Sequence, residues 1–98
     1  MAEPIPYDWR WGPMYINAAN DIAIEAKRAR RKFPPFNSSH EGYAVIAEEL
    51  DELWDDVKAN DVEHSIEEAI QVGAMALRYV ADMRAKLAEQ SQVNTLPT

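Results

Sequence analysis

The chain has 98 residues, about the length of one small domain, and its hydrophobic content of 47% with only three glycines indicates a folded protein rather than a disordered one. It has no cysteine, which excludes disulfide bonds and thiolate metal sites, and its formal charge of −7 argues against stable binding to nucleic acid. No secretory signal or membrane span is recognisable, so we expect a cytoplasmic protein that does not enter a membrane.

Residues 1–12 contain two prolines and three large aromatic residues, Tyr7, Trp9 and Trp11. Proline at this density opposes regular structure, so the pattern predicts an extended N-terminal arm. The arm could cover apolar surface of this subunit or a neighbouring one, or its rings could stack on a planar ligand.

Pro13 is suited to the first turn of a helix, and a helical period continues to about Lys32, before Pro34 and Pro35. The last turns carry a basic run from Lys27 to Lys32. These charges could simply complement the helix dipole. Alternatively, Lys27 and Arg31 could attract the phosphates of an anionic substrate, or the run could bind nucleic acid against the overall negative charge.

A second helix is expected from Ser38, as N-cap, to about Ala59, because Ser38 and Glu41 have the spacing of a capping box. Its apolar residues recur at steps of three and four and form one stripe, which should pack in the core. They are Tyr43, Ile46, Leu50, Leu53, Trp54 and Val57. Trp54 could therefore pack in the core or stack on a substrate base.

This second helix carries six acids between Glu48 and Asp56 and no base among them. Repulsion between carboxylates three and four residues apart costs a few tenths of a kcal/mol per pair. A solvated face would tolerate that cost, but a bound cation would compensate it.

A third helix is expected from Ser65 to about Gln90, followed by a polar tail over residues 91–98. Its apolar residues cover more than half of its circumference, so two further helices cannot bury them all and we expect a homo-oligomer, either a dimer or a tetramer. Gly73, Ala74 and Ala76 would permit a neighbouring helix to approach closely. Arg78 could contact a substrate phosphate or pair with Asp82 one turn later.

The sequence contains two acidic helical motifs about one helix apart: Glu48-Glu49-x-x-Glu52 on the second helix and Glu67-Glu68-x-x-Gln71 on the third. Carboxylates three residues apart share a helix face, and two antiparallel helices can bring two such faces together. Clustered hard oxygen donors suit Mg²⁺ or Mn²⁺, and such ions can clamp a phosphoryl group for attack by water.

The two motifs resemble the signature of the MazG-like, all-α nucleoside triphosphate pyrophosphohydrolases, E-E-x-x-E followed by E-x-x-D. The resemblance covers roughly residues 14–85 and implies an all-α bundle of about three main helices per protomer over residues 13–90, completed by oligomerisation. It also implies metal-dependent cleavage between the α- and β-phosphates of a nucleoside triphosphate. By position, Glu49, Glu52 and Glu68 become metal ligands, and Glu48 becomes a second-metal ligand or the base that orients water.

Gln71 departs from this signature, which usually has Asp there. Its amide oxygen could still bind a metal without supplying charge, or Asp56, one turn beyond Glu52, could complete the site. Glu68 also has a competing interpretation, because Ser65 and Glu68 have the spacing of a capping box.

The favoured function is therefore a pyrophosphohydrolase that converts a (deoxy)nucleoside triphosphate into the monophosphate and pyrophosphate. Analogy with phage-encoded members of the family favours a purine deoxynucleotide such as dGTP. The alternative from another class is a non-catalytic helical module that assembles into oligomers.

Overall fold

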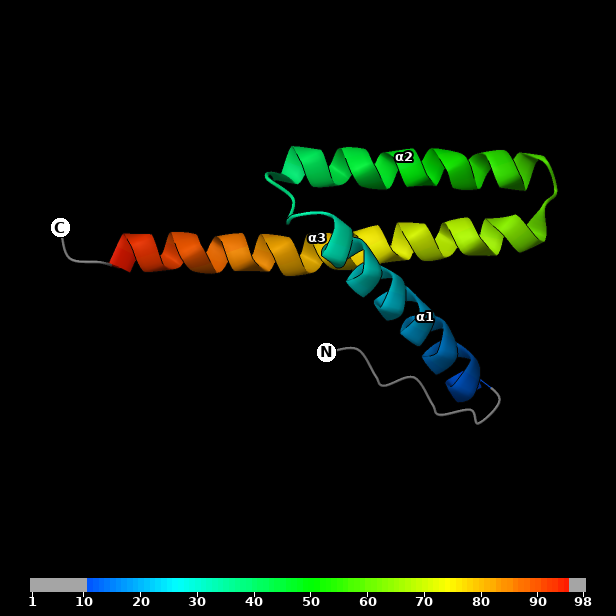
Figure 1. Cartoon of the computed structure of the whole chain (residues 1–98), viewed down its shortest axis with the longest axis horizontal. Coiled ribbons are helices and arrows are strands. Elements are labelled where there is room, and N and C mark those ends of the chain that lie inside the picture. Colours follow the sequence, from blue (N-terminus) through cyan, green and yellow to red (C-terminus); the bar gives the residue numbers. More distant parts are fainter. Residues whose placement is uncertain (1–10, 96–98) are drawn as a thin grey trace, which may run out of the picture.

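The structure is a computed structural model that describes residues 11–95. Three helices account for most of this range: α1 (Trp11–Lys32), α2 (Ser39–Lys58) and α3 (Val62–Thr95). Helices α2 and α3 lie side by side and antiparallel, and α1 crosses α3 obliquely near its middle (Figure 1). Within the described residues α1 and α2 both pack on α3 and not on each other. The expected all-α fold with three main helices is confirmed.

Helix α1 begins at Trp11, two residues before the expected start, so Pro13 lies in the first turn, where its missing N–H costs no hydrogen bond. The helix ends at Lys32, as expected from the two prolines that follow. Residues 1–10, which make up most of the expected N-terminal arm, lie outside the described residues.

The structure confirms that Ser38 is the N-cap of α2. Ser38 has an extended backbone, and its hydroxyl oxygen accepts the backbone N–H of Glu41 at 3.1 Å. The Glu41 carboxylate in turn accepts the side-chain amide of Asn37 at 3.1 Å. The cap therefore fixes both the first turn of α2 and the end of the connection that precedes it.

The turn between α2 and α3 closes through two backbone hydrogen bonds, from Asn60 N–H to the Val57 carbonyl and from Asp61 N–H to the Asp56 carbonyl. This is a Schellman motif, and Asn60 adopts the left-handed conformation that it requires, with φ of 58°. Asp61 then caps α3, because its carboxylate accepts the backbone N–H of His64 at 3.1 Å.

This cap moves the start of α3 to Val62, three residues before the expected start. The Ser65 hydroxyl donates to the Val62 carbonyl at 2.6 Å instead of capping the helix. The interpretation of Glu68 as a capping residue is therefore wrong, because Asp61 already fills that role and Glu68 lies well inside α3. At its other end α3 continues to Thr95, beyond the end expected at about Gln90, so the first five residues of the expected polar tail are helical. Residues 96–98 lie outside the described residues.

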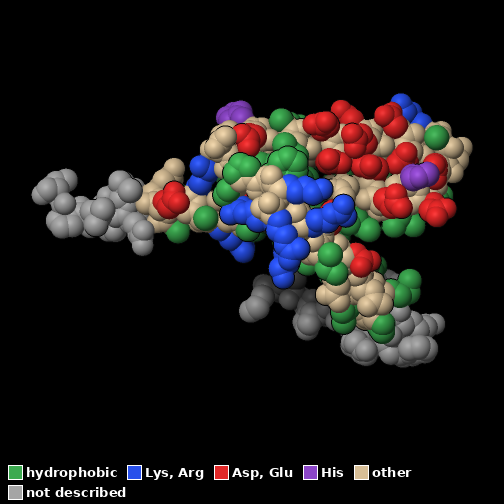
Figure 2. Space-filling view, viewed as in Figure 1, with side chains coloured by type: hydrophobic (Ala, Val, Ile, Leu, Met, Phe, Trp, Pro, Cys, Tyr) green, Lys and Arg blue, Asp and Glu red, His purple; other side chains and the backbone are tan. Residues whose placement is uncertain are grey.

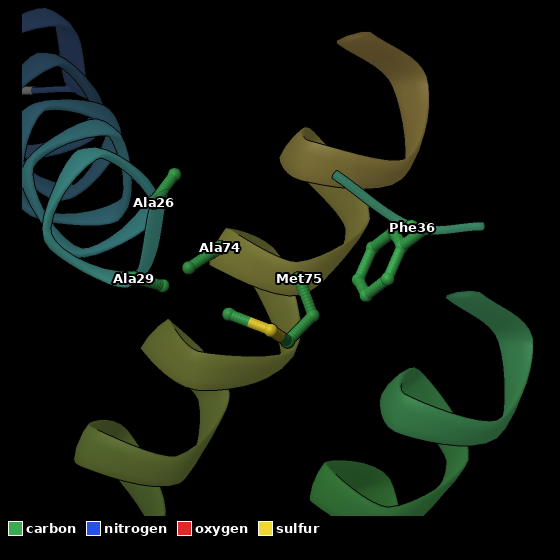
Figure 3. Packing of buried hydrophobic residues seen from close by; sticks show 5 residues of the cluster. All are labelled: Ala26, Ala29, Phe36, Ala74 and Met75. Carbon is green, nitrogen blue, oxygen red and sulfur yellow. The ribbon is translucent and has the colours of Figure 1, made fainter. Parts of the chain in front are cut away.

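The core is small and lies where α1 crosses α3. It is built from Ala26 and Ala29 of α1, Ala74 and Met75 of α3, and Phe36 of the α1–α2 connection (Figure 3). Small side chains let the two helices approach closely. A methyl group placed on Gly73 would lie 3.0 Å from the Ile22 side chain, so the expected role of this part of α3 in close helix packing is confirmed.

Asp82 attaches the α1–α2 connection to α3. Its buried carboxylate accepts the Arg30 guanidinium at 2.7 Å and the backbone N–H of Phe36 at 3.0 Å. The pairing of Asp82 with Arg78 that the sequence suggested is therefore wrong. Arg30, which lies on α1, and the backbone N–H of Phe36 are the hydrogen-bond donors to this carboxylate instead.

Only part of the apolar stripe of α2 packs against the rest of the chain. Gly42, Val45 and Ile46 lie toward the core, and a methyl group on Gly42 would collide with the Tyr79 ring at 2.5 Å. Much of the stripe instead faces outward in the single chain, including Tyr43, Leu50, Trp54 and Val57. The physical reason is that α1 packs on α3 and leaves this side of α2 uncovered.

The radius of gyration is 17.0 Å, against about 13 Å for a compact domain of this length. The single chain thus buries little of its apolar surface. Within residues 11–95, no helix combines the length and the apolar character that a membrane span requires.

Candidate metal and anion site

The turn at Asn60 sets the register between α2 and α3. Glu52 and Glu68 lie eight residues before and after Asn60, and Glu49 and Gln71 lie eleven residues before and after it. Equal distances from the turn place each pair at the same level of an antiparallel helix pair. Carboxylate oxygens of Glu49, Glu52 and Glu68 all lie within 4.8 Å of one another.

Two of these three carboxyl groups, those of Glu49 and Glu68, have a raised pKa. Burial raises the pKa of Glu49 to about 7, with further contributions from a hydrogen bond to Glu68 and from the negative charge of Glu52. Burial also raises the pKa of Glu68, and the charges of Glu52 and Asp56 add to this effect. Glu49 and Glu68 therefore hold their protons to higher pH than isolated glutamates do, and their titrations are linked.

The cluster fits a divalent cation on the chemistry of its donors. One carboxylate oxygen of Glu68, Oε2, is buried and has no hydrogen-bond partner in the described structure. A buried carboxylate oxygen without a donor is unfavourable, and a hard cation would satisfy it. Oxygen ligands from Glu49, Glu52 and Glu68 suit Mg²⁺ or Mn²⁺.

A pocket of about 430 Å³ adjoins the cluster through Glu49. Its walls come from the last turns of α1, the connection that follows, the first half of α2 and the middle of α3. Gln71 lines this pocket beside Glu49. Three cationic side chains also line it, namely Arg28, Lys32 and Arg78, and Phe36 and Met75 form part of its apolar floor.

Arg78 is the most deeply buried of these cations, with 6% of its surface exposed. One guanidinium nitrogen donates to the Pro34 carbonyl at 3.1 Å, and another contacts the Met75 sulfur at 3.4 Å. The guanidinium also lies 4.5 Å from the centre of the Phe36 ring. Its Nε has no hydrogen-bond partner in the described structure.

The remaining α2 acids predicted at the site lie at its margin. Glu48 is exposed and does not belong to the cluster of three carboxylates. Asp56 is half-buried and close enough to influence Glu68, but it does not belong to that cluster either. Both acids are therefore near the cluster without being part of it.

Trp54 lies apart from the site. It is 57% exposed and lines a shallow hollow with Leu50, Leu53 and Val57, which shares no residue with the larger pocket. Lys58 lies 5.7 Å from the centre of its ring. In the single chain Trp54 therefore neither packs in the core nor faces the carboxylate cluster.

The basic run of α1 contributes to the pocket through different residues from those we expected. Arg28 and Lys32 line it, whereas Lys27 and Arg31 do not. Residues four apart share a helix face, so the run offers two such pairs and only the crossing of α1 over α3 decides between them. Figure 2 shows basic side chains gathered over this end of α1, beside the acidic side chains of α2 and α3.

The chain matches no known protein family, no curated protein and no solved structure. The resemblance to MazG-like enzymes therefore depends on the two acidic motifs and on the all-helical pattern in which they occur.

Proposed function

We propose that this chain is a metal-dependent pyrophosphohydrolase that cleaves (deoxy)nucleoside triphosphates between the α- and β-phosphates. The observation that supports the proposal most directly is the convergence of Glu49, Glu52 and Glu68, with one buried oxygen of Glu68 unpartnered. Repulsion within this cluster has no cationic side chain to offset it, because among the described residues none forms an ion pair with these acids.

In this proposal Glu49, Glu52 and Glu68 hold Mg²⁺ or Mn²⁺, and Gln71 or Asp56 completes the ligand set. The ion, when bound, would polarise a phosphoryl group and favour ionisation of a water molecule. Glu48 directly precedes Glu49 in the sequence and is our candidate for the base that orients this water. Arg78 lines the same pocket as Glu49 and is our candidate for a contact to the phosphate chain.

The preference for a purine deoxynucleotide rests only on the resemblance to MazG-like enzymes. We propose a purine deoxynucleoside triphosphate such as dGTP as the first substrate to assay. The apolar part of the pocket, which includes Phe33, Phe36 and Met75, offers room for the rest of such a nucleotide beside the phosphate-binding residues.

Metal binding provides a test that does not depend on turnover. Titration with Mn²⁺ should show saturable binding to the wild-type protein and a loss of at least about tenfold in affinity for Glu52→Gln or Glu68→Gln, because each removes a charged ligand. Glu63→Gln, an exposed acid on α3, is the matched control and should bind as the wild type does. Equal Mn²⁺ affinity in all four proteins would exclude this cluster as the metal site.

A second candidate function is supported by the outer face of α2. Leu50, Trp54 and Val57 are exposed there, and a helix face of this kind is typical of a surface that packs against another subunit. We propose that the chain forms a homo-oligomer through such surfaces. If the protein binds no metal and hydrolyses no nucleotide, a non-catalytic assembly module becomes the better description.

A further inference from the structure

A buried cation without a compensating charge is unusual, and Arg78 is such a residue. Among the described residues no carboxylate forms an ion pair with it, and its hydrogen-bond partners are a carbonyl oxygen and a thioether sulfur, both neutral. Burial of a charge is costly unless an opposite charge or a full set of hydrogen bonds compensates it. Asp82, the acid one turn away, is occupied by Arg30 and by the backbone of Phe36.

A second cation reaches the same pocket from another helix. Lys32, in the last turn of α1, lines the pocket and forms no ion pair with any described carboxylate. Arg28, one turn earlier, also lines the pocket, but it contacts Glu25 at 3.5 Å and is partly neutralised. The α1 wall and the α3 wall of the pocket therefore each carry a cation that forms no ion pair with a described carboxylate.

Among the described residues, the three acids that line the pocket form no ion pair with Arg78 or Lys32. Glu25 pairs with Arg28, and Glu41 accepts hydrogen bonds from Asn37. Glu49 belongs to the carboxylate cluster, with its carboxylate oxygen within 4.8 Å of oxygens of Glu52 and Glu68. The pocket therefore carries acids as well as cations, but Arg78 and Lys32 form no ion pair with any described carboxylate and stay available to an anion.

We propose that this pocket binds a pyrophosphoryl anion between Arg78 and Lys32, and that it does so without a metal ion. The anion is either free pyrophosphate or the β,γ-end of a nucleoside triphosphate. Guanidinium and ammonium groups that line one pocket from two different helices suit a ligand with charged oxygens at both ends. The inference deepens the proposed function, since it assigns this pocket to the part of the substrate that leaves as pyrophosphate.

Calorimetric titration of the full chain with pyrophosphate in the presence of EDTA tests the inference. We expect saturable binding that weakens as salt is added. Lys32→Gln should weaken it about three- to tenfold, and Arg78→Met should weaken it at least about tenfold, since hydrogen bonds to charged groups are the stronger kind. Lys27→Gln removes the same charge from the same helix outside the pocket, and its affinity should stay within about twofold of the wild type.

Competition experiments show whether the pocket binds free pyrophosphate or the β,γ-end of a nucleoside triphosphate. A nucleoside triphosphate that competes with pyrophosphate, while the nucleoside alone does not, supports binding of the phosphate chain. If only free pyrophosphate binds, the pocket is a product site, which still supports the inference. Because Arg78 is buried, circular dichroism and thermal unfolding should accompany its variant, and the comparison of Lys32→Gln with Lys27→Gln decides the matter if Arg78→Met does not fold.

The inference is overturned if pyrophosphate fails to bind in EDTA, or if Lys27→Gln weakens binding as much as Lys32→Gln. These results are distinct from a failure of the proposed function. If the protein binds pyrophosphate without metal but hydrolyses no nucleotide, the anion site is supported and the pyrophosphohydrolase function is rejected. If the protein hydrolyses nucleotides with a metal but does not bind pyrophosphate in EDTA, the function is supported and the anion site is rejected.

Discussion

The raised pKa of Glu49 predicts that metal-free protein loses stability as the pH rises through neutrality. A carboxyl with an ordinary pKa of 4.5 in the unfolded chain and about 7 in the folded protein keeps its proton longer when folded. Between these two values the folded state binds more protons than the unfolded state, so the free energy of unfolding falls with increasing pH. Above about pH 7 the group is ionised in both states, and the loss is complete.

The size of this effect can be bounded from the same values. A rise from 4.5 to about 7, at about 1.4 kcal/mol for each pH unit, gives an upper limit of about 3.5 kcal/mol. Glu49 is only half-buried, and solvent screens its interactions with Glu52 and Glu68. We therefore expect the wild type to lose about 1–2 kcal/mol between pH 5 and pH 8 through this group.

The assay compares urea unfolding of the wild type and Glu49→Gln in EDTA from pH 5 to pH 8.5. The protein concentration is held fixed, because the apparent stability of an oligomer depends on it. Glutamine resembles the protonated acid, so the two proteins should be about equally stable near pH 5. The variant should become more stable by about 1–2 kcal/mol at pH 8. Glu48→Gln removes a charge from the exposed neighbouring position and should follow the wild type.

Added Mn²⁺ should reverse the order at pH 8, because the metal binds the ionised carboxylate of the wild type and loses that ligand in Glu49→Gln. Parallel stability curves for the wild type and Glu49→Gln over the whole pH range would show that the three carboxylates do not repel one another in solution. That result would refute the clustered geometry on which the metal site depends.

Three further predictions concern other parts of the molecule. We expect the wild type to be more active with Mn²⁺ than with Mg²⁺, because the neutral Gln71 oxygen compensates poorly for the water that Mg²⁺ must lose. Gln71→Asp should therefore tighten Mg²⁺ binding and reduce the difference in activity between the two metals. If the ratio of the two activities stays unchanged, Gln71 does not bind the metal. Asp82→Asn should lower the free energy of unfolding by about 1–3 kcal/mol, because it removes the charge that holds Arg30, and chemical denaturation that shows no loss would contradict the role of this contact. Trp54→Glu should shift light scattering toward the 11.1 kDa monomer at unchanged helicity, and a wild type that is already monomeric at micromolar concentration would remove the proposed interface.

Local signals in the sequence predicted the helices well. The Ser38 cap and the two prolines after α1 act within a few residues, and both features are found where the sequence places them. Capping of α3 was less predictable, because Asp61 and Ser65 are both good capping residues. The left-handed turn at Asn60 selects Asp61, and that choice frees Glu68 for the site.

The anion side of the site could not be predicted in the same way. A helical period shows that Arg28 shares a face with Lys32 and that Lys27 shares one with Arg31, but it does not show which face meets α3. Similarly, spacing alone suggested Asp82 as the partner of Arg78, whereas Arg30 reaches Asp82 from a distant part of the chain. Both outcomes depend on how α1 crosses α3, which no local pattern records.

The central claim, a metal-dependent pyrophosphohydrolase, is tested most directly by the products formed from dGTP and the other nucleoside triphosphates with Mg²⁺ or Mn²⁺. Phosphorus NMR separates the monophosphate and pyrophosphate from the diphosphate and inorganic phosphate. We predict monophosphate and pyrophosphate in equal amounts from the wild type, none in EDTA, and a loss of activity in Glu52→Gln and Glu68→Gln. Folded wild-type protein that leaves every triphosphate intact with both metals would contradict the claim, as would activity that survives both substitutions.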